Sequence, residues 1–243
     1  MPCRRLPNTD LSRIAAMKRI TEMGGVKHND MPVISLRIAQ EVASVLSKFQ
    51  KAQKMYQQNY DAFIKLNKTF KVETQNAKMY ISHFIQVMNL SILRGELKKE
   101  IKTGYGLDPA SNTVPDLSNE QNILDWGEKI IKGEQARIMK GGVPVYNPTI
   151  AKVKVHYDIF ADHLFSIRMY RDNVSHTLED ITNMRPAVDD IILDIWNQVE
   201  QTFEELPFAE KIEKCKSFGL IYYFRDSEKA KLKAEKMQNS LEF

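Results

Sequence analysis

The chain has 243 residues, of which 43% are hydrophobic and 27% charged, and its formal net charge is +4 at pH 7. This composition is typical of a soluble globular protein and excludes a wholly disordered chain. With only 10 glycines and 9 prolines, the sequence has too few turn residues to favour a β-sandwich or a β-barrel. No apolar run approaches the roughly 18–20 residues that cross a bilayer, so we expect no membrane partner.

The cysteines and the N-terminus indicate the compartment. Cys3 and Cys215 are the two cysteines, too few for a disulfide framework, which is typical of a reducing environment. The basic N-terminal residues are not followed by the apolar stretch of a secretory signal. We therefore expect a cytoplasmic protein.

The first two predicted elements are a short helix over 10–23 and a long helix over 35–71. Thr9 and its neighbours offer N-cap oxygens for the short helix, and two glycines end it at 24–25. In the long helix, apolar side chains alternate at spacings of four and three from Ile38 to Phe70, with Asn59 as the one polar entry. This spacing is that of a heptad seam and predicts a coiled coil.

The segment over 73–102 is apolar nearly all the way round, so it predicts a central helix that is covered on several sides. A connection over 103–148 follows. It contains two loops, 103–117 and 141–149, on either side of a helix over 118–140, which begins with capping-box spacing at Ser118.

A second seam runs over 149–182, with Arg171 as its one polar entry unless Tyr170 takes that place. Pro186 predicts the start of a fourth long helix over 186–206. The C-terminal extension, 207–243, contains a short helix over 207–218, a strand-like run over 220–224 and a helix over 227–237.

These elements predict an all-α fold. Short turns would make the four long helices two antiparallel hairpins, 35–102 and 149–206, and the connection 103–148 would join them. The simplest arrangement is one elongated four-helix bundle, a single domain over 1–243. Residues 35–71 are strongly basic and residues 186–206 contain acidic side chains without any Lys or Arg. Their polarity would help to set the pairing of these helices, if they are neighbours, or would give the molecule a basic and an acidic face.

Several motifs together resemble an uncharacterised family of bacterial all-helical proteins, and they cover nearly the whole chain. The resemblance implies the all-helical fold and no activity, substrate or catalytic residue. The segments that carry it are Arg5-Leu6-Pro7-Asn8-Thr9-Asp10, Ser82-His83-Phe84-Ile85-Gln86-Val87, Tyr105-Gly106-Leu107, Trp126-Gly127-Glu128, Tyr146-Asn147-Pro148-Thr149-Ile150, Ile195-Trp196-Asn197-Gln198-Val199-Glu200 and Tyr222-Tyr223-Phe224-Arg225.

Patterns for catalysis and metal binding are missing from the sequence. None of the five histidines has a glutamate three residues before it, as a helical di-iron site requires, and there is no Cys-x-x-Cys pair. There is also no glycine-rich phosphate loop and no nucleophile elbow. We therefore expect no catalytic residue, no metal and no cofactor.

The candidate site for a ligand or partner is formed by the two loops and their neighbours: His83, Tyr105, Trp126, Tyr146 and Asn147. Loops carry function more often than cores do, and the helix over 118–140 must fold back for the two loops to meet. The alternative is that the loops are packed connections and that His83 is a hydrogen-bonded core residue.

Asn59 and Arg171 are candidate polar seam residues. They either fix the register of the helices or line a polar pocket.

We expect a non-enzymatic structural or interaction module that binds a protein partner or its own copy. The alternative is a nucleic-acid-associated protein that uses the basic face of 35–71, where Lys48, Lys51 and Lys54 alternate with glutamines. A small-molecule site at the loops 103–117 and 141–149 is the third alternative.

Overall fold

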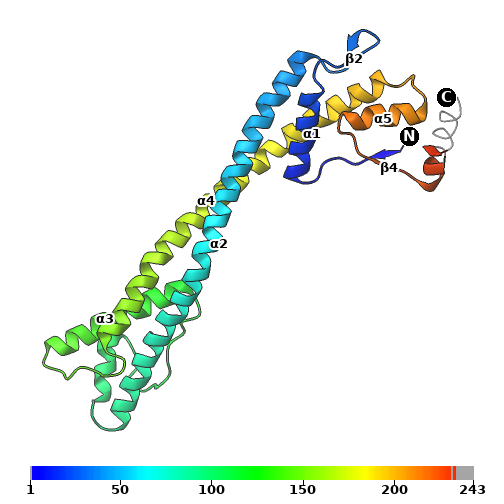
Figure 1. The fold of residues 1–243 in the computed structure, drawn as a ribbon. Helices are drawn as coiled ribbons and strands as arrows, with labels where there is room; N and C mark the ends of the chain where they lie inside the picture. The colour runs from blue at the N-terminus through cyan, green and yellow to red at the C-terminus, as the bar shows by residue number, and fades with distance from the viewer. Residues whose placement is uncertain (1, 231, 234–243) are drawn as a thin grey trace. The chain divides into compact units, whose positions relative to one another are not determined.

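The computed structural model describes residues 2–230 and 232–233, and this part of the chain is mostly helical (Figure 1). The short strands β1 (Cys3–Arg4) and β4 (Tyr222–Tyr223) pair antiparallel, as do β2 (Lys27–His28) and β3 (Met31–Pro32). The prediction of an all-α protein is confirmed. The helices are α1 (Asp10–Glu22), α2 (Leu36–Leu93), the 3-10 helix η1 (Lys99–Tyr105), α3 (Glu120–Met139), α4 (Ile150–Thr202) and α5 (Phe208–Ser217).

The predicted start of the first helix is confirmed. Thr9 is the N-cap of α1: its hydroxyl accepts a hydrogen bond from the Ser12 backbone N–H, and the Ser12 hydroxyl oxygen accepts one from the Thr9 N–H. This reciprocal capping box satisfies two N–H groups that would otherwise lack partners. The cap of α3 is Asn119, one residue after the predicted Ser118.

The prediction of a hairpin over 35–102 is wrong, because α2 is one continuous helix of 58 residues. No turn interrupts it near residue 72, and it ends at Leu93 rather than near 102. The sequence there offers only β-branched residues such as Val72 and Thr74, which cost a helix a few tenths of a kcal/mol each and do not break it. The residues after Leu93 form a turn and then η1.

The second hairpin, 149–206, is wrong for a different reason. Pro186 does not start a helix but lies inside α4, which is 53 residues long. A proline removes one backbone donor and strains the preceding turn. Here Pro186 is exposed, so water can satisfy the carbonyl that it leaves free, while Ile181 and Val188 are buried on the other side of the helix.

Residue contacts divide the chain into two compact units, each described here by itself. Unit 1 comprises the described residues of 1–58 and 175–243, and unit 2 comprises 59–174. Each unit has its own core of buried apolar side chains. The single domain over 1–243 stays a prediction.

The core of unit 1 is formed by α1, α5 and the unit's parts of α2 and α4. Phe49, Trp196 and Phe218 are among its largest buried side chains. At one side, β1 and β4 bring the two ends of the described chain together.

Ion pairs in unit 1 do not follow the predicted pairing of the basic 35–71 segment with the acidic 186–206 segment. Asp189 instead accepts hydrogen bonds from Arg13 of α1, at 2.7 and 2.8 Å. Glu200 lies 3.4 Å from Arg4 of β1. Both segments contribute to the same core, so apolar packing and not ion pairing holds them there.

The core of unit 2 is formed by α3, η1 and the unit's parts of α2 and α4. The rings of Phe70 on α2 and Phe160 on α4 stack with centroids 5.7 Å apart. The predicted cover of 73–102 on several sides is partly wrong, since Phe84 and Met88 are buried but Leu90 and Leu93 are exposed.

The helix predicted over 227–237 lies partly outside the described residues, and 226–230 and 232–233 are helical. None of the helices in the described ranges is long and apolar enough to span a bilayer.

Candidate functional site

The two loops of the predicted site meet at Glu134, a carboxylate of α3 that is completely buried. The Tyr105 hydroxyl at the end of η1 donates a hydrogen bond to this carboxylate. Arg137 donates two hydrogen bonds to it, at 2.8 and 2.7 Å, and the backbone N–H of Val145, in the loop 141–149, donates another at 3.0 Å. One side chain of α3 thus fastens both loops.

This arrangement depends on Gly133. A Cβ atom at that position would lie 2.6 Å from the Tyr105 ring and 2.9 Å from the Gly104 carbonyl oxygen. The helix can approach η1 closely only because residue 133 has no side chain. The same holds at Gly127, where a Cβ atom would lie 2.3 Å from the Tyr157 ring.

The electrostatics of the Glu134 cluster favour a charged carboxylate beside a neutral phenol. Burial by itself would raise the pKa of Glu134, but the hydrogen bonds from Arg137, Tyr105 and the Val145 backbone outweigh it, and the pKa is lowered. Burial, and then the neighbouring Glu134, raise the pKa of Tyr105. Because both carboxylate oxygens have donors, the cluster is a satisfied structural network.

The other candidate residues lie apart from this cluster. His83 is exposed on α2, so it is not the buried core residue of the alternative reading. Tyr146 is 69% exposed, and Asn147 has a φ of 51° directly before Pro148. Trp126 is half-buried and lines a cavity of about 260 Å³ together with Asn89 and Asp108.

The polar seam residues are not both inside. Asn59 is half-buried, whereas Arg171 is exposed and lies 3.7 Å from Glu120. Tyr170 is half-buried, so the local shift that replaces Arg171 by Tyr170 in the seam agrees with the burial.

Sequence reasoning missed a buried lysine next to the Trp126 cavity. Lys102 is 1% exposed, and its ammonium donates to the Ser111 carbonyl at 2.8 Å and to Asn112 Oδ1 at 2.7 Å. Asn89 holds the same loop by donating from Nδ2 to the Asn112 carbonyl at 3.0 Å. A lysine near the end of a predicted helix normally reads as a surface residue, so no signal in the sequence marks it.

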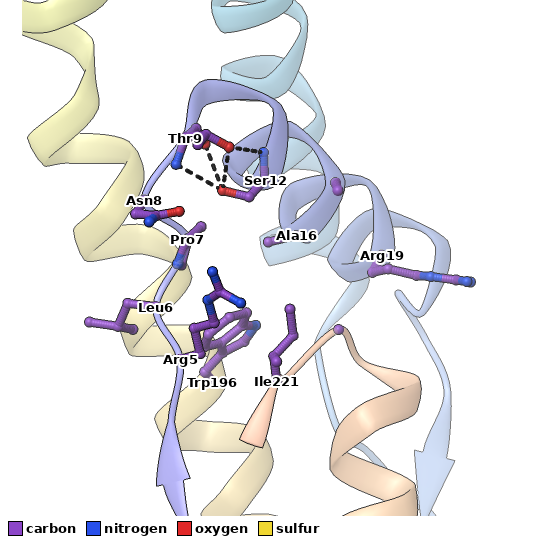
Figure 2. Close-up of a pocket in the computed structure, with 12 residues that line it drawn as sticks. Arg5, Leu6, Pro7, Asn8, Thr9, Ser12, Ala16, Arg19, Trp196 and Ile221 are labelled. Atoms are coloured by element: carbon purple, nitrogen blue, oxygen red, sulfur yellow. Dashed lines mark hydrogen bonds between the residues drawn. The ribbon is translucent and has the colours of Figure 1, made fainter. Parts of the chain in front are cut away.

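A second candidate site lies in unit 1, in a cavity of about 400 Å³ between the segment after β1, the first turns of α1 and the residues before β4 (Figure 2). The β1–β4 pairing positions one wall, because the Arg5 N–H continues the ladder with a 2.8 Å hydrogen bond to the Ile221 carbonyl. Figure 2 shows Arg5, Trp196 and Ile221 grouped below the turn in which Thr9 and Ser12 form the capping box.

Trp196 of α4 lines this cavity and is 1% exposed. Its indole Nε1 is buried and has no hydrogen-bond acceptor among the described residues. A buried donor that lacks an acceptor costs about 1–3 kcal/mol, so this nitrogen is the unusual polar atom of the site. The sequence predicted Trp196 only as a residue flanking the apolar face of a helix.

Comparisons with known proteins find no matching family model, no similar curated protein and no similar solved structure. In residues 2–230 and 232–233, no group of three or more His, Cys, Asp or Glu side chains is arranged to hold a metal ion. The geometry of the two units is therefore what the functional argument uses.

Proposed function

We propose that this chain is a non-enzymatic interaction protein and that unit 2 binds a protein partner through the outward side of α4. The observation that carries this proposal is the exposure of four apolar side chains on that helix. The exposed fractions are 55% for Val155, 39% for Ile159, 75% for Phe165 and 47% for Met169.

These four side chains share one side of α4. At about 100° per residue they fall within an arc of roughly 120°, opposite the side that carries Phe160 and Leu164 into the core. Apolar residues that are exposed singly are common, but a cluster on one helix face is typical of a docking surface. Asp162, which lies among them, gives the face a polar component, as interaction surfaces have.

The test is site-specific photo-crosslinking in the native cells. A photoreactive phenylalanine analogue at position 165 is expected to form a discrete protein adduct. The same analogue at the exposed position 98, in the turn before η1, is the matched control. Phe165→Ser in a chain crosslinked from position 169 should reduce the adduct. Equal adducts at 165 and 98, or none at 165, would contradict the proposal.

A second candidate function, nucleic-acid binding, is favoured by one observation on α2. Exposed lysines follow one another along this helix, and no salt bridge in the described ranges involves them. Lysines without carboxylate partners are free to neutralise phosphates. They are Lys48, Lys51, Lys54, Lys65, Lys68 and Lys71.

The test of this second candidate is fluorescence anisotropy with duplex and single-stranded oligonucleotides over a range of salt concentrations. Binding through these lysines should weaken steeply with salt, and K51E/K54E should weaken it further. The exposed Lys98→Glu is the charge-matched control. Binding that is absent at low salt, or that responds equally to both variants, would rule out this face.

A further inference from the structure

We propose that the unit 1 cavity at Arg5 and Trp196 binds a small molecule that combines a carboxylate with an apolar body. Two separate observations meet at this cavity. One is a buried indole N–H without an acceptor, and the other is a guanidinium without a carboxylate partner. Neither is used by the docking surface on α4 of unit 2.

The indole N–H points to an acceptor that is absent from the described protein. Indole Nε1 can only donate a hydrogen bond, so it cannot be satisfied by neighbouring donors. Trp196 could fill its place in the core as an apolar ring, but a ring with a donor lines the cavity beside Arg5 (Figure 2). A carboxylate oxygen in the cavity would supply the missing acceptor.

Arg5 supplies the charge. Its backbone is fixed by the hydrogen bond to Ile221, and its guanidinium lies 5.6 Å from the centroid of the Tyr223 ring. In the described ranges no Asp or Glu side chain lies within 4 Å of it, whereas the neighbouring Arg4 lies 3.4 Å from Glu200. A guanidinium with free donors can hold a carboxylate through two parallel hydrogen bonds.

The rest of the lining defines the ligand class. No Asp or Glu lines the cavity, so the site does not repel an anion. Much of the wall is apolar, including Leu6, Ala16 and Ile221, and its volume of about 400 Å³ lies in the range of small-molecule sites. An inorganic phosphate would leave these apolar surfaces uncovered. A carboxylate that carries an aliphatic or aromatic group would cover them.

The experiment uses the full chain with 15N-labelled tryptophan and follows the indole N–H signals during titration with cyclohexanecarboxylate. The sequence has two tryptophans, and Trp126→Phe assigns the two signals. We expect a saturable downfield shift of the Trp196 signal and no change at Trp126. Arg5→Met should weaken the apparent affinity roughly tenfold or more, because it removes a charge-assisted hydrogen bond.

The controls separate this site from general effects. Arg37→Met removes another exposed arginine of unit 1 and should leave the titration unchanged. Arg5→Lys keeps the charge and should retain part of the binding, which guards against a folding defect in Arg5→Met. A Trp196 signal that does not move would overturn the proposal. So would equal shifts with neutral cyclohexylmethanol or with inorganic phosphate, because these would remove the carboxylate or the apolar body from the argument.

Discussion

At the scale of single residues, Glu134 connects a buried charge to the stability of unit 2. Its pKa is lowered from the ordinary value of 4.5, so the unfolded chain takes up a proton at this position more readily than the folded one. The stabilisation is therefore present above about pH 4.5 and is lost as the pH falls through the folded pKa.

Glu134→Gln is expected to lower the free energy of unfolding by about 2 kcal/mol at neutral pH, because the amide offers Arg137 and Tyr105 a weaker acceptor. It should also flatten the loss of stability below pH 4.5, which urea titrations at several pH values would measure. Glu128→Gln, an exposed neighbour on α3, is the control. Parallel pH profiles for the wild type and Glu134→Gln would contradict this account.

Gly133 provides a second test at this scale. Alanine has the higher helix propensity by about 1 kcal/mol, so Gly133→Ala would stabilise an exposed helix. Here the added Cβ would lie 2.6 Å from Tyr105, and we expect a net loss of about 1–3 kcal/mol in the free energy of unfolding. Gly104→Ala, whose Cβ would have no neighbour within 4 Å, should change stability little in the same denaturation experiment.

At the scale of elements, Pro186 shows how a breaking signal is overruled within α4. The helix persists because its buried side is anchored by Ile181 and Val188, and because the proline is on the exposed side. The residue then carries a cost that the surrounding core offsets.

Pro186→Ala restores one backbone donor and should raise the free energy of unfolding by roughly 1–3 kcal/mol, less the entropy that proline removes from the unfolded chain. Urea unfolding followed by circular dichroism measures the change. Pro207→Ala is the matched control, since Pro207 is the N-cap of α5 and replaces no intrahelical donor. A destabilised Pro186→Ala would mean that this proline shapes α4 in a way that its core requires.

At the scale of the whole molecule, two separate cores predict two regions of local stability. Ile130 is buried in the core of unit 2, and truncating it to alanine should cost about 2–5 kcal/mol. We expect hydrogen exchange of Ile130→Ala to accelerate mainly in peptides from 59–174, because the lost contacts lie there. Ile192→Ala, in the core of unit 1, should show the reverse pattern. Equal acceleration throughout by either variant would indicate a single cooperative unit.

The sequence by itself determined the helical class, the start of α1 and the approximate range of α3, because capping residues and apolar periodicity act within a few residues of each other. It also identified the loops that meet at Glu134, although not Glu134 itself. A glutamate inside a polar helix pattern reads as solvated, and only burial distinguishes it.

Only the tertiary structure decided where the long helices are continuous, that His83 and Arg171 are exposed, and that Arg5 and Trp196 line one cavity. The physical reason is that these features depend on which side of an element is covered by residues far away in the chain. Periodicity describes one element at a time, whereas burial, and with it the cost of a proline or an unpaired indole donor, is set by the elements packed around it.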